Sequence, residues 1–104
     1  NPEYMERFKD FGPYRFSNAR FSAKRKKAKW RLNREQYYKL IKNKCIYCFK
    51  NLDAYGIGLD RKNPKGDYRV GNVVPCCKRC NWIKGSWFSY SQMIRVGKLI
   101  KEFK

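Results

Sequence analysis

Two pairs of cysteines are the residues of this sequence best suited to chemistry. Cys45 and Cys48 form one Cys-x-x-Cys pair, and Cys77 and Cys80 form the second. A spacing of two residues lets one tight turn present both thiolates to the same metal, and two such turns complete a tetrahedral Zn²⁺ site. The sequence therefore predicts a structural zinc site. The remaining cysteine, Cys76, is expected to pack as a small buried side chain, or to be the ligand in place of Cys77.

The segment between the two pairs holds polar residues that suit phosphate chemistry, namely Asp60, Arg61, Tyr68 and Asn72. Cleavage of a phosphodiester requires stabilisation of charge on the phosphate oxygens and a positioned nucleophile. A hard cation held by a carboxylate and a carboxamide meets the first need, and an arginine supplements it. The sequence contains no histidine, which excludes an imidazole base or an imidazole metal ligand.

The elements that must position these residues are expected in the order strand, turn, strand, helix. Alternating apolar residues predict a strand over about residues 55–62, and residues 63–67 have the composition of a turn. A returning strand is expected over residues 70–75. A helix over residues 77–84 follows, and Gly85 stops it.

Further helices are expected on both sides of this unit. Asn33 and Gln36 form a capping-box pattern that predicts a helix over residues 34–43, and Ser89 and Gln92 open a terminal helix in the same way. The apolar residues expected to pack along the terminal helix are Met93, Ile94, Leu99, Ile100 and Phe103.

Three less regular segments carry weaker expectations. Residues 1–12 show roughly helical spacing of apolar residues and predict a short helix. Trp30 and Leu32 predict a short strand or a staple. The aromatic residues near the second cysteine pair are expected in the core or over the zinc site rather than stacked on bases; they are Trp82, Trp87 and Phe88.

The charge of the chain points to a polyanionic partner. The net charge is +18, from 26 Lys and Arg against 8 Asp and Glu. No acidic residue lies between Gly12 and Arg34, and self-repulsion there favours phosphate contacts over a solvated helix face. The residues predicted to contact nucleic acid are Arg15, Arg20, Lys24, Arg25, Lys26, Lys27, Lys29, Arg31 and Lys84.

A membrane surface is the rival partner for so basic a chain. No apolar run approaches the roughly 18 residues of a membrane-spanning helix, and no signal peptide is visible. We therefore expect an intracellular location, in the cytoplasm or on the nucleoid. Cysteine pairs in such a reducing compartment are expected to bind metal rather than to form disulfides.

The motifs CIYC, GLDRKNPKGDY, GNVVPC and CKRCNWIKG together resemble those of the HNH endonucleases, the ββα-metal nucleases. The chain is most similar to a variant of that family with Asp-Arg and Tyr where most members have Asp-His. The resemblance covers about residues 45–88 and implies a small α+β fold. The length of the chain is that of one domain, spanning residues 1–104. This domain would comprise a basic helical arm over 1–44, a zinc-stapled ββα-metal core over 45–88 and a C-terminal helix over 89–104.

The resemblance also implies an activity, that of a metal-dependent endonuclease or nickase acting on double-stranded DNA. It makes Asp60 and Asn81 ligands of a catalytic Mg²⁺ or Mn²⁺. Arg61 would stabilise the pentavalent phosphate and activate Tyr68, the candidate nucleophile or proton acceptor. Asn72 would hold the loop or orient the catalytic group. A double-strand cut would require a homodimer or two successive nicks.

Each assignment has a structural alternative. Tyr68 can be a turn tyrosine packed on the strand, and Asp60 can be a structural partner of Arg61. Asn72 can turn the backbone, and Asn81 can cap the helix. The sequence is therefore also consistent with a catalytically inactive zinc module that binds DNA or structured RNA within a larger assembly.

Overall fold

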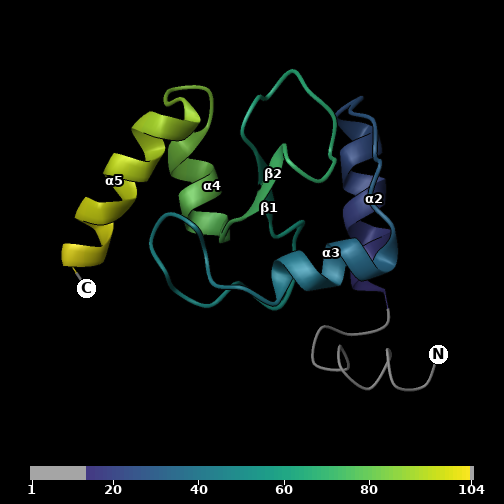
Figure 1. Ribbon diagram of the computed structural model, residues 1–104, viewed down its shortest axis with the longest axis horizontal. Coiled ribbons are helices and arrows are strands. Elements are labelled where there is room, and N and C mark those ends of the chain that lie inside the picture. Colours follow the sequence, from purple (N-terminus) through teal and green to yellow (C-terminus); the bar gives the residue numbers. More distant parts are fainter. Residues whose placement is uncertain (1–13, 104) are drawn as a thin grey trace.

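The computed structural model describes residues 14–103, in which four α-helices flank a two-stranded antiparallel sheet (Figure 1). The protein is thus a small α+β fold, as expected. The helix expected over residues 1–12 lies outside the described residues. The described elements are α2 (Arg15–Arg25), α3 (Arg34–Ile41), β1 (Leu59–Arg61), β2 (Val73–Pro75), α4 (Lys78–Lys84) and α5 (Tyr90–Glu102).

The helices fall into two groups on opposite sides of the sheet. Helices α2 and α3 lie on one side and α4 and α5 on the other (Figure 1). Each group has its own hydrophobic cluster: the first gathers the aromatic residues of α2 and α3, and the second surrounds the cysteines and α5. No helix of the described part of the chain is long and apolar enough to cross a membrane.

Helix α2 buries one face against α3. Phe16, Ala19 and Ala23 recur at helical spacing and are all buried. The Phe16 ring packs edge-on against Tyr37 at 5.7 Å. The backbone N–H of Phe16 donates to the Tyr38 hydroxyl at 3.2 Å. Small alanines on this face let the two helices approach closely, while the opposite face of α2 stays open.

Both capping boxes predicted from the sequence are present. Asn33 Oδ1 accepts from the backbone N–H of Gln36 at 2.8 Å, and Gln36 Oε1 accepts from the N–H of Asn33 at 2.9 Å. Ser89 and Gln92 make the same reciprocal pair at the start of α5. These hydrogen bonds satisfy backbone donors that a helix leaves unpaired at its N-terminus. The start of each helix is therefore confirmed, and α3 ends two residues earlier than expected.

The sheet is shorter than the sequence predicts. Strand β1 covers only residues 59–61, because Gly56 and Gly58 adopt positive φ angles of 92° and 74° that bend the chain before it. Its register pairs Asp60 with Val74 of β2. Val70, expected in the returning strand, precedes β2 and is 56% exposed. The turn between the strands lies at residues 63–67, as predicted.

Two predictions of burial on the second side of the sheet are wrong. Trp82 and Trp87 are each 84% exposed, so they neither join the core nor cover the cysteines. On α5, Met93 is fully buried whereas Leu99 is 54% and Phe103 83% exposed. Leu99 lies about 120° around the helix from Met93 at 100° per residue. It therefore misses the single face of α5 that is covered.

The predicted strand or staple at Trp30 is a single bridge. Trp30 pairs with Tyr68 in parallel fashion. The N–H of Tyr68 donates to Lys29 O at 2.9 Å, and the N–H of Arg31 donates to Tyr68 O at 2.8 Å. This bridge ties the chain after α2 to the turn region between β1 and β2.

Candidate metal centre and candidate active site

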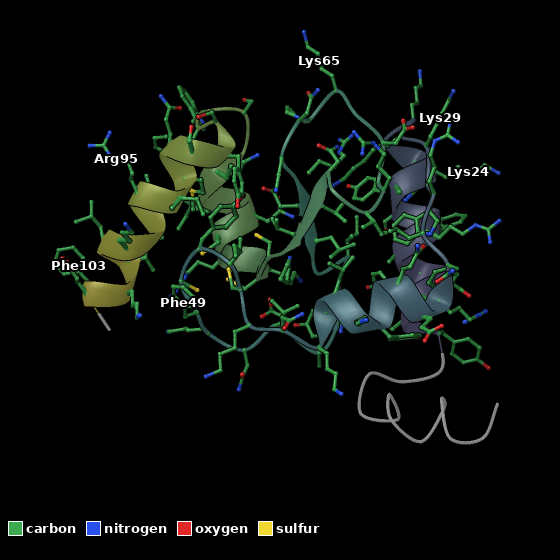
Figure 2. All side chains as sticks on the ribbon, in the orientation of Figure 1. Lys24, Lys29, Phe49, Lys65, Arg95 and Phe103 are labelled. Atoms are coloured by element: carbon green, nitrogen blue, oxygen red, sulfur yellow. The ribbon has the colours of Figure 1, made fainter. Side chains whose placement is uncertain are left out.

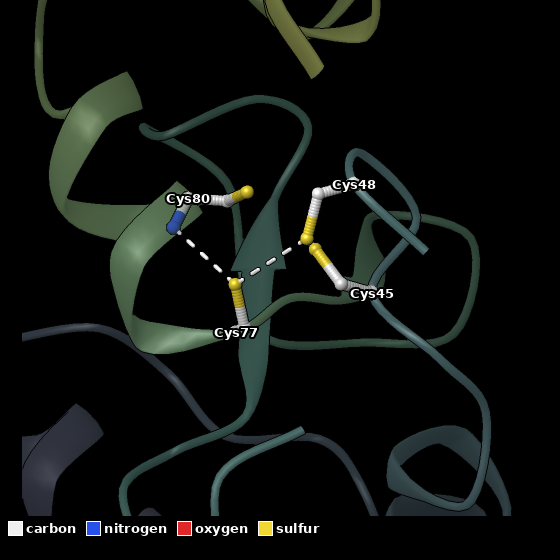
Figure 3. Close-up of side chains that lie close together, drawn as sticks. All are labelled: Cys45, Cys48, Cys77 and Cys80. Atoms are coloured by element: carbon white, nitrogen blue, oxygen red, sulfur yellow. Dashed lines mark hydrogen bonds between the residues drawn. The ribbon is translucent and has the colours of Figure 1, made fainter. Parts of the chain in front are cut away.

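Four cysteines form a buried cluster (Figure 3). It lies where the turn at residues 45–48, here called the first knuckle, meets the start of α4. Residues 77–80 form the second knuckle. The ligand atoms of Cys45, Cys48, Cys77 and Cys80 all lie within 4.8 Å of one another. A tetrahedral Zn²⁺ with Zn–S bonds of about 2.3 Å separates its sulfurs by about 3.8 Å. The Sγ atoms of Cys48 and Cys77 are 3.8 Å apart. The residues present therefore fit a metal ion such as zinc.

Backbone hydrogen bonds hold the two knuckles together. The N–H of Ile46 donates to Pro75 O at 2.9 Å, which fastens the first knuckle to the end of β2. Phe49, at a positive φ of 63°, closes the turn, and its N–H donates to Cys45 O at 2.9 Å. Cys77 is the N-cap of α4 and accepts from the N–H of Cys80 at 3.4 Å. The second knuckle is thus the first turn of a helix.

The cysteine cluster needs a positive charge to be stable as thiolates. Burial raises the pKa of the Cys77 thiol, because a thiolate loses hydration in an apolar surrounding. A bound Zn²⁺ supplies the opposing charge. Cys76 lies outside the four-cysteine group, is 1% exposed and donates its S–H to Cys77 O at 3.3 Å. It packs as the small buried side chain that the sequence suggested.

Asp60, on β1, contacts Tyr47 and Lys84. The Tyr47 hydroxyl donates a hydrogen bond to its Oδ2, and the Lys84 ammonium lies 3.3 Å from both carboxylate oxygens. All three side chains are buried, with Asp60 7%, Lys84 3% and Tyr47 1% exposed. Burial and the hydrogen bond to Asp60 raise the pKa of Tyr47. Asp60 is therefore a paired, hydrogen-bonded carboxylate in a closed position.

Arg61 and Tyr68 lie next to this pair. The Arg61 guanidinium sits over the Tyr68 ring at 4.9 Å and donates to Gly66 O at 2.9 Å. The Lys84 ammonium also reaches Arg61 O at 3.4 Å. Burial raises the pKa of Tyr68, Arg61 opposes that rise, and Asp60 adds to it. The expected lowering by Arg61 is present but is outweighed by burial.

Asn72 holds the loop between the strands, which is one of the two roles expected for it. Its Oδ1 accepts from the N–H of Asn63 at 3.0 Å, and its Nδ2 donates to Asp67 O at 2.9 Å and Asn63 O at 3.2 Å. The amide is 5% exposed. A Cβ on Gly66 would come within 2.8 Å of Asn72 Nδ2. The turn is therefore built closely around this one amide.

Asn81 lies on α4 beside the same strand. Its Nδ2 donates to Leu59 O at 3.4 Å, so the amide is close to β1 and one residue from Asp60. It does not cap α4, because the N-cap is Cys77. The five residues that the sequence proposed as catalytic are thus distributed over β1, the connection between the strands and α4. The structure brings Arg61 and Tyr68 together and places Asn81 beside β1, whereas the side chain of Asn72 contacts the turn.

A divalent cation at Asp60 does not fit the residues as they are arranged. Mg²⁺ prefers near-octahedral oxygen ligands and keeps several waters. The Asp60 carboxylate already accepts from Tyr47 and faces the Lys84 ammonium, and it is buried. A second cation would have to displace Lys84. The two charges compete for the same carboxylate.

The basic residues expected to contact nucleic acid mostly face solvent. Lys24 and Lys29 project away from the ribbon on the α2 side (Figure 2). The other exposed members of the predicted set are Arg20, Arg25, Lys26, Lys27 and Arg31. Arg31 pairs with Asp67 at 2.6 Å. A bound phosphate would therefore share the Arg31 guanidinium with that carboxylate.

Two members of that set lie elsewhere. Arg15 is 5% exposed, and its guanidinium donates to Gly56 O at 2.8 Å and Asp53 O at 3.0 Å. It therefore fastens the loop before β1 instead of facing phosphate. Lys84 is buried against Asp60. In both cases the long side chain turns into the protein, where carbonyl or carboxylate oxygens take its charge.

Sequence reasoning missed Tyr47 as a member of the site. It lies between the two cysteines of the first knuckle, which the hydrogen bond from Ile46 fastens to the end of β2. Its hydroxyl donates to Asp60 on the neighbouring strand. No periodicity or spacing in the sequence indicates that contact.

Comparison with known proteins gives no match to a protein family, to a curated protein or to a solved structure.

Proposed function

We propose that this chain hydrolyses phosphodiester bonds in DNA, as an endonuclease or nickase of the HNH type. The observation that supports this proposal is the contact of Lys84 from α4 with the Asp60 carboxylate and with the backbone carbonyl of Arg61 on β1, beside a four-cysteine cluster. The acid and the arginine on β1, together with Tyr68, whose ring the Arg61 guanidinium covers, are residues that the resemblance calls for. The net charge of +18 supplies the attraction to a phosphate backbone.

Arg61 is the group in this region best suited to contact the scissile phosphate. It is half-buried, and one of its N–H groups is used by Gly66 O. A guanidinium has five N–H donors in a planar fork, so others remain for the phosphate oxygens. Fixed donors and charges that face the transition state are usually the largest contribution to such catalysis. Lys84 adds positive charge behind the strand and is held in place by Asp60.

Water is a better nucleophile for this site than Tyr68. The tyrosine is 3% exposed, stacks on Trp30 at 5.4 Å and has a raised pKa. A phenolate would have to form in a closed apolar position, which costs free energy. Water would add to phosphorus and release a proton to solvent, the P–O bond to the leaving oxygen would break, and that oxygen would take up a proton from solvent. Tyr68 then supports the Arg61 guanidinium through ring contact.

The resemblance assigns a catalytic Mg²⁺ or Mn²⁺ to Asp60 and Asn81. This form of the proposal requires Lys84 to leave the carboxylate when the substrate or the metal arrives. The cysteine cluster has a separate role in it, as the structural Zn²⁺ site. Lys84 would then keep its contact with Arg61 O but lose the Asp60 carboxylate. The plasmid assay below tests the metal requirement.

A second candidate function is a zinc module that binds nucleic acid without cutting it. The observation that favours it is the closure of the region, since Asp60, Tyr68 and Lys84 are each less than one-tenth exposed. In that case the ion pair and the tyrosine stack only stabilise the fold. The exposed basic residues of α2 and the following segment would still hold DNA or structured RNA.

Supercoiled plasmid separates the two candidates. Zinc-loaded protein is incubated with the plasmid with Mg²⁺, with Mn²⁺ and without added divalent ion, beside the variants Arg61→Gln, Asp60→Asn and Tyr68→Phe. We expect nicking that falls at least a hundredfold in Arg61→Gln and persists in Tyr68→Phe, because one transition-state donor contributes roughly 10²–10³ in rate. Glu35→Gln is the matched control, since it removes an exposed carboxylate from α3.

The outcomes of the plasmid assay divide clearly. Loss of nicking in Tyr68→Phe would indicate that Tyr68, and not water, is the nucleophile. Nicking only with a divalent ion supports the metal-dependent form. A wild-type protein that retards the plasmid on a gel but never cuts it, with zinc content and circular dichroism unchanged, supports the binding module and contradicts the nuclease.

A further inference from the structure

The open face of α2 borders a hollow of about 530 Å³. Ser17, Arg20, Phe21 and Lys24 recur at helical spacing on the side of α2 opposite its buried residues, and the chain after the helix closes the hollow with Ala28 and Trp30. Pockets that hold small ligands commonly measure roughly 300–1,000 Å³. The hollow is therefore large enough for a nucleotide.

The lining combines two cations with two aromatic rings. Arg20 and Lys24 are exposed, Phe21 is 61% exposed, and Trp30 is half-buried. Residues 14–34 include no acid that could neutralise the cations. An aromatic surface beside paired positive charges suits a planar base attached to a phosphate. It does not suit an apolar peptide, which would leave both cations without a counter-charge.

We propose that this hollow binds one unpaired nucleotide, with the base against Phe21 and Trp30 and its phosphates at Arg20 and Lys24. The inference rests on the proposed nucleic-acid partner and adds a preference for a single-stranded or unstacked segment. A base within an intact duplex is stacked on its neighbours, so only an unpaired base presents a free face to the rings. The hollow is thus expected to select unpaired nucleotides, whereas the net charge alone would attract any polyanion.

Ring contacts connect the hollow to the candidate active site. Trp30 stacks on Tyr68 with ring centroids 5.4 Å apart and planes 29° apart, and Arg61 covers Tyr68 at 4.9 Å. The N–H of Tyr68 also donates to Lys29 O. A base held at Trp30 therefore sits at one end of a continuous series of contacts whose other end is Arg61. This arrangement would place an unpaired segment beside the phosphate to be cut.

The test compares a short oligo(dT) with an abasic strand of the same length. Both strands carry the same backbone charge, so the ratio of their dissociation constants isolates the contribution of the bases. Binding is followed by fluorescence anisotropy of labelled strands without added divalent ion and without chelator. Phe21→Ala is the main variant, because an exposed ring can be removed without opening the core. Circular dichroism melting checks the fold of each variant.

We expect wild type to prefer oligo(dT), and Phe21→Ala to reduce that preference about fivefold or more, since stacking on one ring contributes roughly 1–3 kcal/mol per base. Arg20→Gln should weaken both strands alike. Phe103→Ala and Trp82→Ala are the matched controls, because each removes an exposed ring outside the hollow. Both controls should keep the wild-type ratio.

Failure of this inference and failure of the proposed partner give different results. Equal binding of the two strands by wild type overturns the nucleotide site and leaves the nucleic-acid partner intact. If the preference for oligo(dT) falls in Trp82→Ala but not in Phe21→Ala, the bases stack on α4. That result also overturns the nucleotide site at the hollow. Absence of binding to either strand and to duplex contradicts the proposed nucleic-acid partner itself.

Discussion

The cysteine cluster and the Asp60 site lie next to each other, since α4 carries both Cys80 and Lys84 and Tyr47 lies between Cys45 and Cys48, yet they balance charge in opposite ways. The cluster gathers four buried sulfurs, and the cation beside them, Arg79, is exposed to solvent. The Asp60 site gathers one carboxylate with a lysine ammonium at 3.3 Å and a hydroxyl donor. The first requires a cation from solution to hold its thiolates. The second contains its cation already.

This difference indicates which of the two sites contributes more to the stability of the fold. A structural zinc site contributes its binding free energy to folding, because the ligands are not gathered in the unfolded chain. A buried ion pair contributes little net stability, since desolvation offsets most of the attraction, but breaking it by removing one partner is costly. We therefore expect loss of metal to unfold the chain and loss of Lys84 to weaken it.

Removing one cysteine ligand should have the largest effect. Cys45→Ala leaves three ligands, and apparent zinc binding is worth about 10 kcal/mol or more in small zinc modules, against a total stability of about 5–15 kcal/mol for an ordinary domain. The variant should lose cooperative thermal unfolding. Far-ultraviolet circular dichroism during heating, with zinc content measured by mass spectrometry, checks this expectation.

Cys76→Ala is the control for the cysteine variant. Its thiol is as buried as that of Cys45 but lies outside the four-cysteine group. The variant should bind one zinc per chain and unfold cooperatively, with a loss of about 1 kcal/mol from the small cavity. A wild-type protein that remains folded after a chelator has removed all metal would contradict the dependence on zinc. The fold would then not depend on the cysteine cluster more than on the Asp60 site.

The sequence predicts those parts of the fold that depend on neighbouring residues. The starts of α3 and α5 follow from side chains three residues from the backbone groups they cap. The end of α4 follows from Gly85, which adopts a positive φ of 43°. The cluster of four cysteines follows from their spacing in two Cys-x-x-Cys pairs. Each of these features is fixed by local geometry, so a local pattern is enough to find it.

What the sequence misses depends on how separate elements pack. The apolar pattern marks both Met93 and Leu99 for packing, but it does not show that only the face of α5 with Met93 is covered. Charge shows that Arg15 and Lys84 are cationic, but not that each one is buried on oxygens of a distant segment. The sequence therefore identifies these two residues as cations but not the groups that they contact.

The next prediction concerns Lys84 and should have a smaller effect than loss of the metal. Lys84→Met leaves the buried Asp60 carboxylate without its cation, which costs about 3–5 kcal/mol when one partner of a buried pair is removed. Urea unfolding at neutral pH, with zinc content unchanged, measures the loss. The variant should remain folded with a lower midpoint, unlike Cys45→Ala.

The double variant Asp60→Asn/Lys84→Met is the control for the ion pair. It removes both charges, so its loss should be clearly smaller than the sum of the two single losses. Additive losses, or a Lys84→Met variant as stable as wild type, would mean that Asp60 and Lys84 do not form a pair in solution. Asp60 would then be free to face a divalent cation, and the contrast between the two sites would disappear.

Tyr47→Phe should have the smallest effect of the three, and it tests the contact that joins the two sites. The ring stays in the cluster beside Tyr90, at 6.1 Å between centroids, and only the hydroxyl that donates to Asp60 is lost. A hydrogen bond to a charged group contributes about 1.5–3 kcal/mol. Urea unfolding should show a loss in that range, with zinc content and circular dichroism unchanged.

Tyr90→Phe is the matched control, because it removes a hydroxyl from the half-buried ring that packs against Tyr47, and its loss should be near zero. In the Lys84→Met background the Tyr47→Phe loss should grow, since Tyr47 is then the remaining donor to the carboxylate that the structure shows. A loss that is the same in both backgrounds would mean that Tyr47 and Lys84 act independently. Asp60 would then not be the group that joins the cysteine knuckle to the candidate active site.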